Sequence, residues 1–183
     1  MQMNVQADKV ATEAGVEPLT LTELKTMLGV RTSDHDDYLT DMITSAREFA
    51  ESRTNLALIE STVTATISHQ MRFVYLPYAP IKSITSIKNY NSSGIEIGDL
   101  TEGSHYDLRS PDNTEMHFLQ ELPSYHVKVV YTAGFTTVPK IVKTVVEKLC
   151  RFWYDEPDKV MLYNDKASEI LALLRTISKR SRI

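Results

Sequence analysis

The spacing of apolar residues changes its period twice along this chain, and that order constrains the fold more than any other feature. Between residues 18 and 55, apolar side chains recur every three or four residues, the period of an amphipathic helix. From residue 60 to residue 135 they alternate with polar residues or form short runs, as in strands. Helical spacing returns after residue 138. This order predicts a β block inserted between two helical segments.

The first helical segment carries clear start and stop signals. Thr20 and Glu23 have the spacing of a capping box, so they predict a short helix that Gly29 ends. A second helix is expected from about residue 33 to residue 54, with acidic residues at its positive N-terminal end. The apolar residues of this second helix step by three and four and predict one buried face: Leu39, Met42, Ile43, Ala46, Phe49 and Ala50.

The middle segment alternates between strand and turn signals. The turn cluster Asn91 to Gly94 predicts a hairpin between two of the strands. Together the strands predict an antiparallel β-sheet block over residues 60–135. They are expected at residues 63–67, 73–76, 81–90, 95–97, 105–108, 114–119 and 125–131.

Two further helices are predicted over residues 138–183. The first begins near Pro139 and ends before Pro157, and the second runs from about residue 165 to residue 178. We expect the two helical pairs to meet in space. The prediction is therefore one α+β domain over residues 18–183, in which helices at 19–55 and 138–183 form a bundle around the inserted sheet block. Residues 1–17 show neither period and predict a flexible arm.

Charge is distributed unevenly along the chain. Residues 1–60 carry 5 basic and 11 acidic side chains, whereas residues 139–183 carry 10 and 6. This polarity suits head-to-tail contact between identical subunits or docking on an acidic partner, although solvated faces of either sign are also ordinary. The net charge of -4 is too mild for a nucleic-acid coat or a membrane-surface binder. With one cysteine and no apolar stretch near ~18 residues, we expect a soluble intracellular protein without a membrane partner.

The sequence offers little that could support catalysis. Asp34, His35, Asp36 and Asp37 form the densest polar cluster, but consecutive helical residues point in different directions and cannot converge on one ion. We interpret this cluster as helix capping and expect no metal. Cys150 belongs to an apolar helical stripe and is expected to pack in the core. No nucleophile elbow, phosphate loop or dinucleotide fingerprint occurs, so no catalytic residue and no cofactor are predicted.

The end of the chain is the candidate contact surface. An apolar stripe on the last helix leads there into a basic cluster, which fits docking on another protein. Basic residues at a helix C-terminus also fit a frayed, solvated tail or contact with DNA phosphates, and the sequence leaves these alternatives open. The residues assigned to partner contact are Ile170, Leu174, Arg175, Ile177, Lys179, Arg180 and Arg182.

Several short segments identify a family when their order and spacing are considered together, although each segment alone is common. They are LTLTELK (19–25) with Leu28, DDYL (36–39), SAREFAE (45–51), LPYAPIKSI (76–84), YDL (106–108), VVYTAGF (129–135), VP (138–139) and FWY (152–154). Together they resemble the head-tail connector proteins, also called adaptor or head-completion proteins, of long-tailed bacteriophages and prophages.

This resemblance implies a structural, non-enzymatic protein in the virion, at the head–tail interface, assembled in the cytoplasm of the bacterial host. It implies a ring of about a dozen copies that docks on the phage portal protein and extends the channel through which DNA passes without specific binding. The ring would present a platform for the next connector or tail protein, and the C-terminal residues would contact the portal. The alternative function is a DNA-binding packaging accessory that grips the duplex with the basic C-terminal end.

Overall fold

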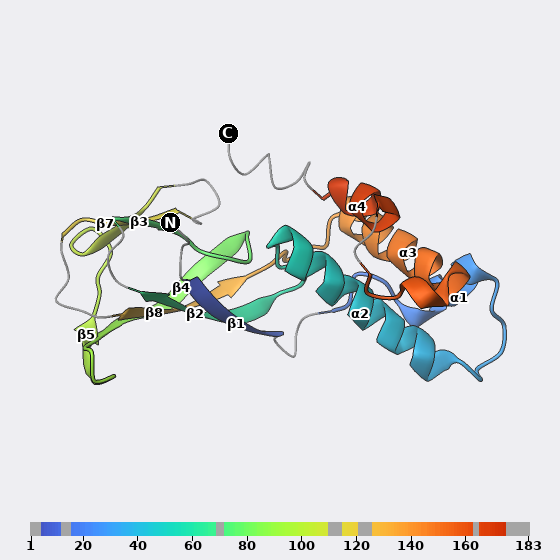
Figure 1. Cartoon of the computed structure of the whole chain (residues 1–183), viewed down its shortest axis with the longest axis horizontal. Helices are drawn as coiled ribbons and strands as arrows, with labels where there is room; N and C mark the ends of the chain where they lie inside the picture. The colour runs from blue at the N-terminus through green and yellow to red at the C-terminus, as the bar shows by residue number, and fades with distance from the viewer. Residues whose placement is uncertain are drawn as a thin grey trace.

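The computed structural model describes residues 5–11, 16–68, 72–109, 115–120, 126–162 and 165–174. Helices gather at one end of an elongated molecule and strands at the other (Figure 1). Within the described residues there are four α-helices and two antiparallel sheets. The predicted α+β class is therefore confirmed.

The helices lie where the helical period predicted them: α1 (Leu21–Leu28), α2 (Asp36–Thr54), α3 (Lys140–Asp155) and α4 (Asp165–Ala172). A short 3-10 turn, η1 (Pro157–Lys159), follows α3. Side chains from all four helices share one hydrophobic core, so helices from both ends of the chain meet. Within this core, Phe49 of α2 packs edge-on against Trp153 of α3, with ring centroids 5.5 Å apart.

The start of α1 has the predicted capping box. The Glu23 backbone N–H donates to Thr20 Oγ1 at 3.3 Å, and the Thr20 N–H donates to Glu23 Oε2 at 3.0 Å. Gly29 ends the helix with a φ of 75°, a conformation that glycine adopts without steric cost. The Glu23 carboxylate also forms an ion pair with Lys143, which ties α1 to α3.

The Glu23–Lys143 ion pair leads to a testable pH dependence. Hydrogen bonds from Lys143 and Thr20 lower the pKa of Glu23 from 4.5 to about 2. Because this pKa is depressed on folding, Glu23 stabilises the fold above pH 4.5, and the contribution is lost as the pH falls toward 2. We expect Lys143→Met to raise the pKa of Glu23 by about one in a carboxyl NMR titration. Lys148→Met, at an exposed lysine of the same helix, should leave that pKa unchanged; equal titration curves for both variants would contradict the ion pair.

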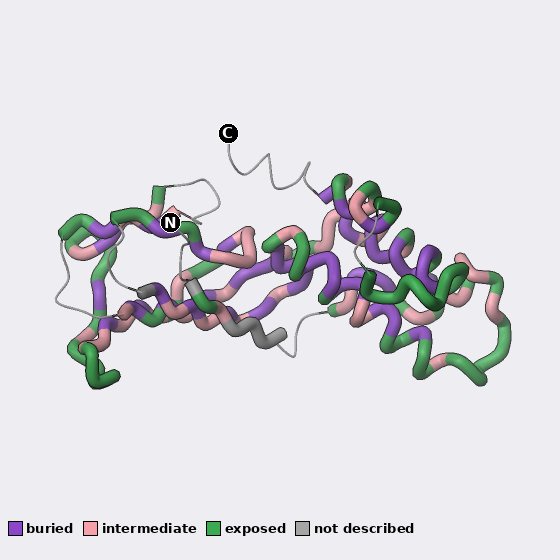
Figure 2. Tube along the Cα trace, viewed as in Figure 1, coloured by how far each residue is buried: buried purple, intermediate pink, exposed green. Residues whose placement is uncertain are grey.

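The strands form two sheets rather than one block. The larger has the order β1 (Val5–Ala11), β2 (Ser61–Ser68), β8 (His126–Ala133), β4 (Ile81–Tyr90) and β5 (Glu96–Asp99). The predicted hairpin joins β4 to β5 and is confirmed. The smaller sheet has the order β3 (Phe73–Tyr75), β7 (Glu115–Phe118) and β6 (Tyr106–Leu108). Side chains of both sheets contribute to a second hydrophobic core (Figure 2).

The prediction of a flexible arm over residues 1–17 is wrong for residues 5–11. These residues form β1, which pairs antiparallel with β2 from Val5 opposite Ile67 to Ala11 opposite Ser61. An edge strand is held by its backbone hydrogen bonds to one neighbour and needs no regular apolar alternation, so the sequence gives no periodic signal there. The remainder of the predicted arm, apart from residues 16 and 17, lies outside the described residues.

Candidate interaction surfaces

The apolar stripe of α4 packs inward. Leu171 is 4% exposed and Leu174 is fully buried in the helical core, against which Ile170 is also packed. Leu174 is therefore a core residue in this fold, and its assignment to partner contact is corrected: its side chain is buried in the helical core rather than exposed to solvent. The other assigned residues, Arg175, Ile177, Lys179, Arg180 and Arg182, lie outside the described residues.

An exposed apolar loop connects α3 to α4. It consists of Val160, Met161 and Leu162, which are 36%, 47% and 52% exposed, and we call these three residues the apolar loop. Its turn is held by backbone hydrogen bonds from Val160 to Pro157 at 3.3 Å and from Leu162 to Lys159 at 3.1 Å. Sequence reasoning missed this surface because three apolar residues after a proline have no period that distinguishes a loop from a helix end.

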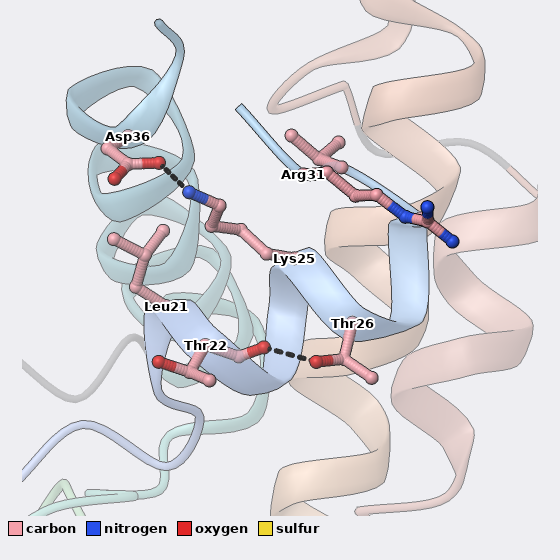
Figure 3. A pocket seen from close by; sticks show the side chains of 8 residues that line it. Leu21, Thr22, Lys25, Thr26, Arg31 and Asp36 are labelled. Atoms are coloured by element: carbon pink, nitrogen blue, oxygen red, sulfur yellow. Dashed lines mark hydrogen bonds and ion pairs between the residues drawn. The ribbon is translucent and has the colours of Figure 1, made fainter. Parts of the chain in front are cut away.

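A pocket of about 540 Å³ lies between α1 and the start of α2. Its walls include Leu21, Thr22, Lys25, Thr26, Arg31 and Asp36, and we call it the α1 pocket. Lys25 forms an ion pair with Asp36. Figure 3 shows Lys25 turned toward Asp36, while the guanidinium of Arg31 extends away from that pair. The pocket therefore combines an apolar wall with an exposed cation.

The outer face of the smaller sheet is aromatic. Phe73 and Tyr75 on edge strand β3 are 52% and 48% exposed, whereas Val74 between them is buried in the second core. Phe73 stacks on the His117 ring of β7 at a centroid distance of 5.8 Å. This face therefore exposes aromatic side chains beside a buried strand residue.

A buried ion network ties α2 to two other segments. Arg47 is 4% exposed, and its Nε donates to both carboxylate oxygens of Glu17 at 3.0 and 2.9 Å. Its Nη1 donates to Glu51 Oε2 at 2.8 Å, and Glu51 Oε1 accepts the Leu58 N–H at 2.7 Å. Burial alone would lower the pKa of Arg47, but the two carboxylates raise it. The network therefore links α2 to Glu17, in the segment before α1, and to Leu58, in the segment before β2. We expect these links to stabilise the fold.

The acidic cluster at the start of α2 does not converge on a common point. His35 is the N-cap of α2 without a side-chain hydrogen bond, and Asp36 binds Lys25. In the described part of the chain, no group of three His, Cys, Asp or Glu side chains could hold a metal ion. None of the described helices is long and apolar enough to cross a membrane.

Cys150 lies in the helical core, as its stripe predicted. Burial raises the pKa of its thiol to about 12, and Sγ lies 3.8 Å from the Met42 carbonyl oxygen. Because a thiol reacts as the thiolate, we expect Ellman's reagent to leave folded protein unlabelled at neutral pH and to label one thiol per chain after unfolding in urea. Fast labelling of the folded protein would contradict the burial of this side chain.

Comparisons with known proteins point to one kind of particle. A model of the head completion protein family matches residues 17–161. No curated protein sequence matches the chain significantly. One similar structure is a chain from the neck of an empty GTA particle computed with C6 symmetry, at a TM-score of 0.68 and 21% identity, covering 97% of this chain and 95% of that one.

Two other solved structures resemble the chain. One comes from the virion of a native gene transfer agent (GTA) particle, with a TM-score of 0.68, 22% identity and coverage of 96% of this chain and 94% of the other. The other comes from the neck of a native GTA particle computed with C12 symmetry, with a TM-score of 0.61, 19% identity and coverage of 97% and 94%. At these identities the structures share the fold with this chain.

Proposed function

The chain belongs to the head completion protein family, and on that premise we propose that it is a structural connector in the neck of a phage or prophage virion, at the interface of head and tail. The family match over residues 17–161 is the observation that carries the proposal. The likeness of the fold to chains from GTA necks, over nearly the whole length of both chains, supports it.

In this proposal the protein assembles as a ring that docks on the portal, extends the DNA channel and presents a platform for the next connector or tail protein. The neck structures that resemble it were computed with C6 and C12 symmetry, which supports a closed ring. Such a ring uses head-to-tail contacts between two different surfaces of each copy. A net charge of -4 also suits a conduit, because a strongly basic lining would hold the duplex by counterion release.

The experiment that tests this function is a mass measurement. Purified protein is analysed by size exclusion with light scattering, alone and mixed with the cognate portal, and the largest species is imaged by electron microscopy. A ring of about a dozen copies, alone or on the portal, supports the connector. A monomer that does not bind the portal contradicts the connector function. Duplex binding that falls steeply with salt, without any ring, would favour the packaging accessory instead.

Residues 175–183 keep their assignment to portal contact in this proposal, because they carry four basic and no acidic side chains. Deleting them leaves Leu174 and the helical core in place. We expect the deletion to weaken portal binding at least tenfold, corresponding to ~1.4 kcal/mol, in a pull-down titration. The matched variant replaces Arg175, Lys179, Arg180 and Arg182 with Gln, which separates the charges from the apolar contribution of Ile177. Unchanged binding after the deletion would remove the assignment.

A further inference from the structure

We propose that the apolar loop of one copy docks in the α1 pocket of the next copy around the ring. This contact rests on the proposed function, since it presumes a ring, and it names the two surfaces that meet in it. The loop supplies Val160, Met161 and Leu162. The pocket receives them between α1 and the start of α2.

The apolar loop has the properties of an inserted contact. Three consecutive large apolar side chains are exposed in a turn that the backbone holds closed, so their exposure is part of a defined shape. Met161 has a φ of 59°, the left-handed region that costs a non-glycine residue free energy. The chain therefore keeps a strained turn and exposes apolar surface at the same place.

The α1 pocket complements the loop in polarity and charge. Leu21 and the neighbouring Val30 give it an apolar wall, and Arg31 gives it an exposed cation. Asp158, an exposed carboxylate, lies two residues before the apolar loop, and the exposed Lys159 stands between them. Neither Arg31 nor Asp158 has an ion pair within the described residues, so each is available to the other across a contact between copies.

The placement of the two surfaces suits a head-to-tail contact. One flank of α1 faces α3, because Glu23 pairs with Lys143 and the Met27 carbonyl accepts from Arg151 at 3.5 Å. The pocket is on the other flank, toward Asp36 of α2. The apolar loop instead leaves α3 toward α4, where Glu156 pairs with Lys166. Both surfaces belong to the helical end of the molecule (Figure 1), and they are built from different elements of it.

Ring closure requires two different surfaces on each copy. A copy that carries both halves of a heterologous contact can bind one neighbour with each half, and a closed rotation then uses every half. No residue of the apolar loop lines the pocket of its own copy. In a single chain the apolar loop and the α1 pocket therefore do not contact each other, and a second copy supplies the partner of each.

Disulfide crosslinking tests the contact, and the buried Cys150 makes it feasible because the native thiol lies in the core. The chain with both Met161→Cys and Thr22→Cys is assembled, oxidised and run on a non-reducing gel. We expect a ladder of head-to-tail oligomers, and no dimer from either single variant, because residue 161 meets residue 22 and never its own counterpart. The control pair is Met161→Cys with Asp99→Cys, at the opposite end of the molecule (Figure 1), and should give no ladder.

The outcomes separate this contact from the proposed function. Rings in the electron microscope without a ladder from the Met161→Cys and Thr22→Cys chain overturn the contact and leave the connector standing. Dimers from a single variant overturn it too, because they show a symmetric contact. The absence of any ring, alone or on the portal, overturns both.

A second measurement does not depend on crosslinking geometry. The double variant Met161→Ser and Leu162→Ser should keep the unfolding transition of the wild type, because both side chains are exposed, and should assemble at least tenfold less well. Val16→Ser removes an apolar side chain that is 75% exposed and belongs to neither surface, so it should assemble normally. Equal assembly of the two variants would overturn the contact.

Discussion

Gly134→Ala should destabilise the protein by more than about 4 kcal/mol, a loss that few single substitutions reach. A Cβ at this position would lie 2.1 Å from the Ile59 carbonyl oxygen, 2.6 Å from its carbon and 2.9 Å from the Glu60 nitrogen. These are backbone atoms just before β2, so no side chain can rotate away. The φ of 108° is also unfavourable for any residue with a Cβ. Urea unfolding followed by circular dichroism measures the loss.

Gly103→Ala is the matched control for this prediction. Gly103 also has a positive φ, of 78°, but nothing lies within 4 Å of a Cβ built there. Its replacement should therefore cost only the left-handed backbone conformation, about 1–2 kcal/mol. If both variants unfold at the same urea concentration, the close approach at Gly134 does not constrain the fold.

The position of Gly134 explains the size of the expected effect. It directly follows β8, where the chain leaves the larger sheet for α3, and its N–H donates to the Pro80 carbonyl at 2.9 Å. Ile59 and Glu60 lead from the helical end into β2. Two crossings between helices and sheets, α2 to β2 and β8 to α3, are thus packed backbone against backbone at one glycine, and the connection from β3 to β4 accepts its N–H. A Cβ there would have to displace the backbone that leads into β2.

The sequence predicted the parts of this fold that depend on local periodicity. All six residues of the expected α2 face are buried, and so are Val63, Ala65 and Ile67 of the alternating strand β2. A helix or strand that buries one face requires apolar residues at regular positions, and each segment carries that spacing in its own sequence. The sequence also predicts the apolar stripe of α4. The burial of Leu174 depends on how α4 packs against the other helices, which the stripe alone does not specify.

The features that the sequence did not reveal depend on partners far along the chain. β1 exists through its ladder with β2, whose paired residues lie 50 to 62 positions further along the chain, and the strands divide into two sheets according to pairings that no local pattern encodes. Among the candidate surfaces, the α1 pocket arises where Arg31 and Asp36 fold back beside α1. Residues 30 apart meet in the Arg47–Glu17 pair, which gives no sequence signal at either position.

Arg47→Met should cost about 3–5 kcal/mol of unfolding free energy, the range for breaking a buried ion pair from one side. Methionine replaces the apolar stem of Arg47 but removes the ion pair of the Glu51 carboxylate, which is 3% exposed, with the guanidinium. Glu17 loses both of its hydrogen bonds from Nε as well. The penalty comes from a charge that stays buried after its compensation is removed.

Arg53→Met serves as the control on the same helix. Arg53 is exposed near the end of α2, with its guanidinium 5.5 Å from the Phe49 ring centroid, so its loss should cost under ~1 kcal/mol. The double variant Arg47→Met and Glu51→Met also removes the buried Glu51 carboxylate. It should therefore be more stable to unfolding than Arg47→Met alone, even though the Leu58 N–H then loses its acceptor. Equal losses for Arg47→Met and Arg53→Met would mean that the network does not hold α2 to the segments before α1 and β2. A recovery in the double variant would show that charge compensation, rather than packing of the arginine stem, joins the helices to the sheets at this point.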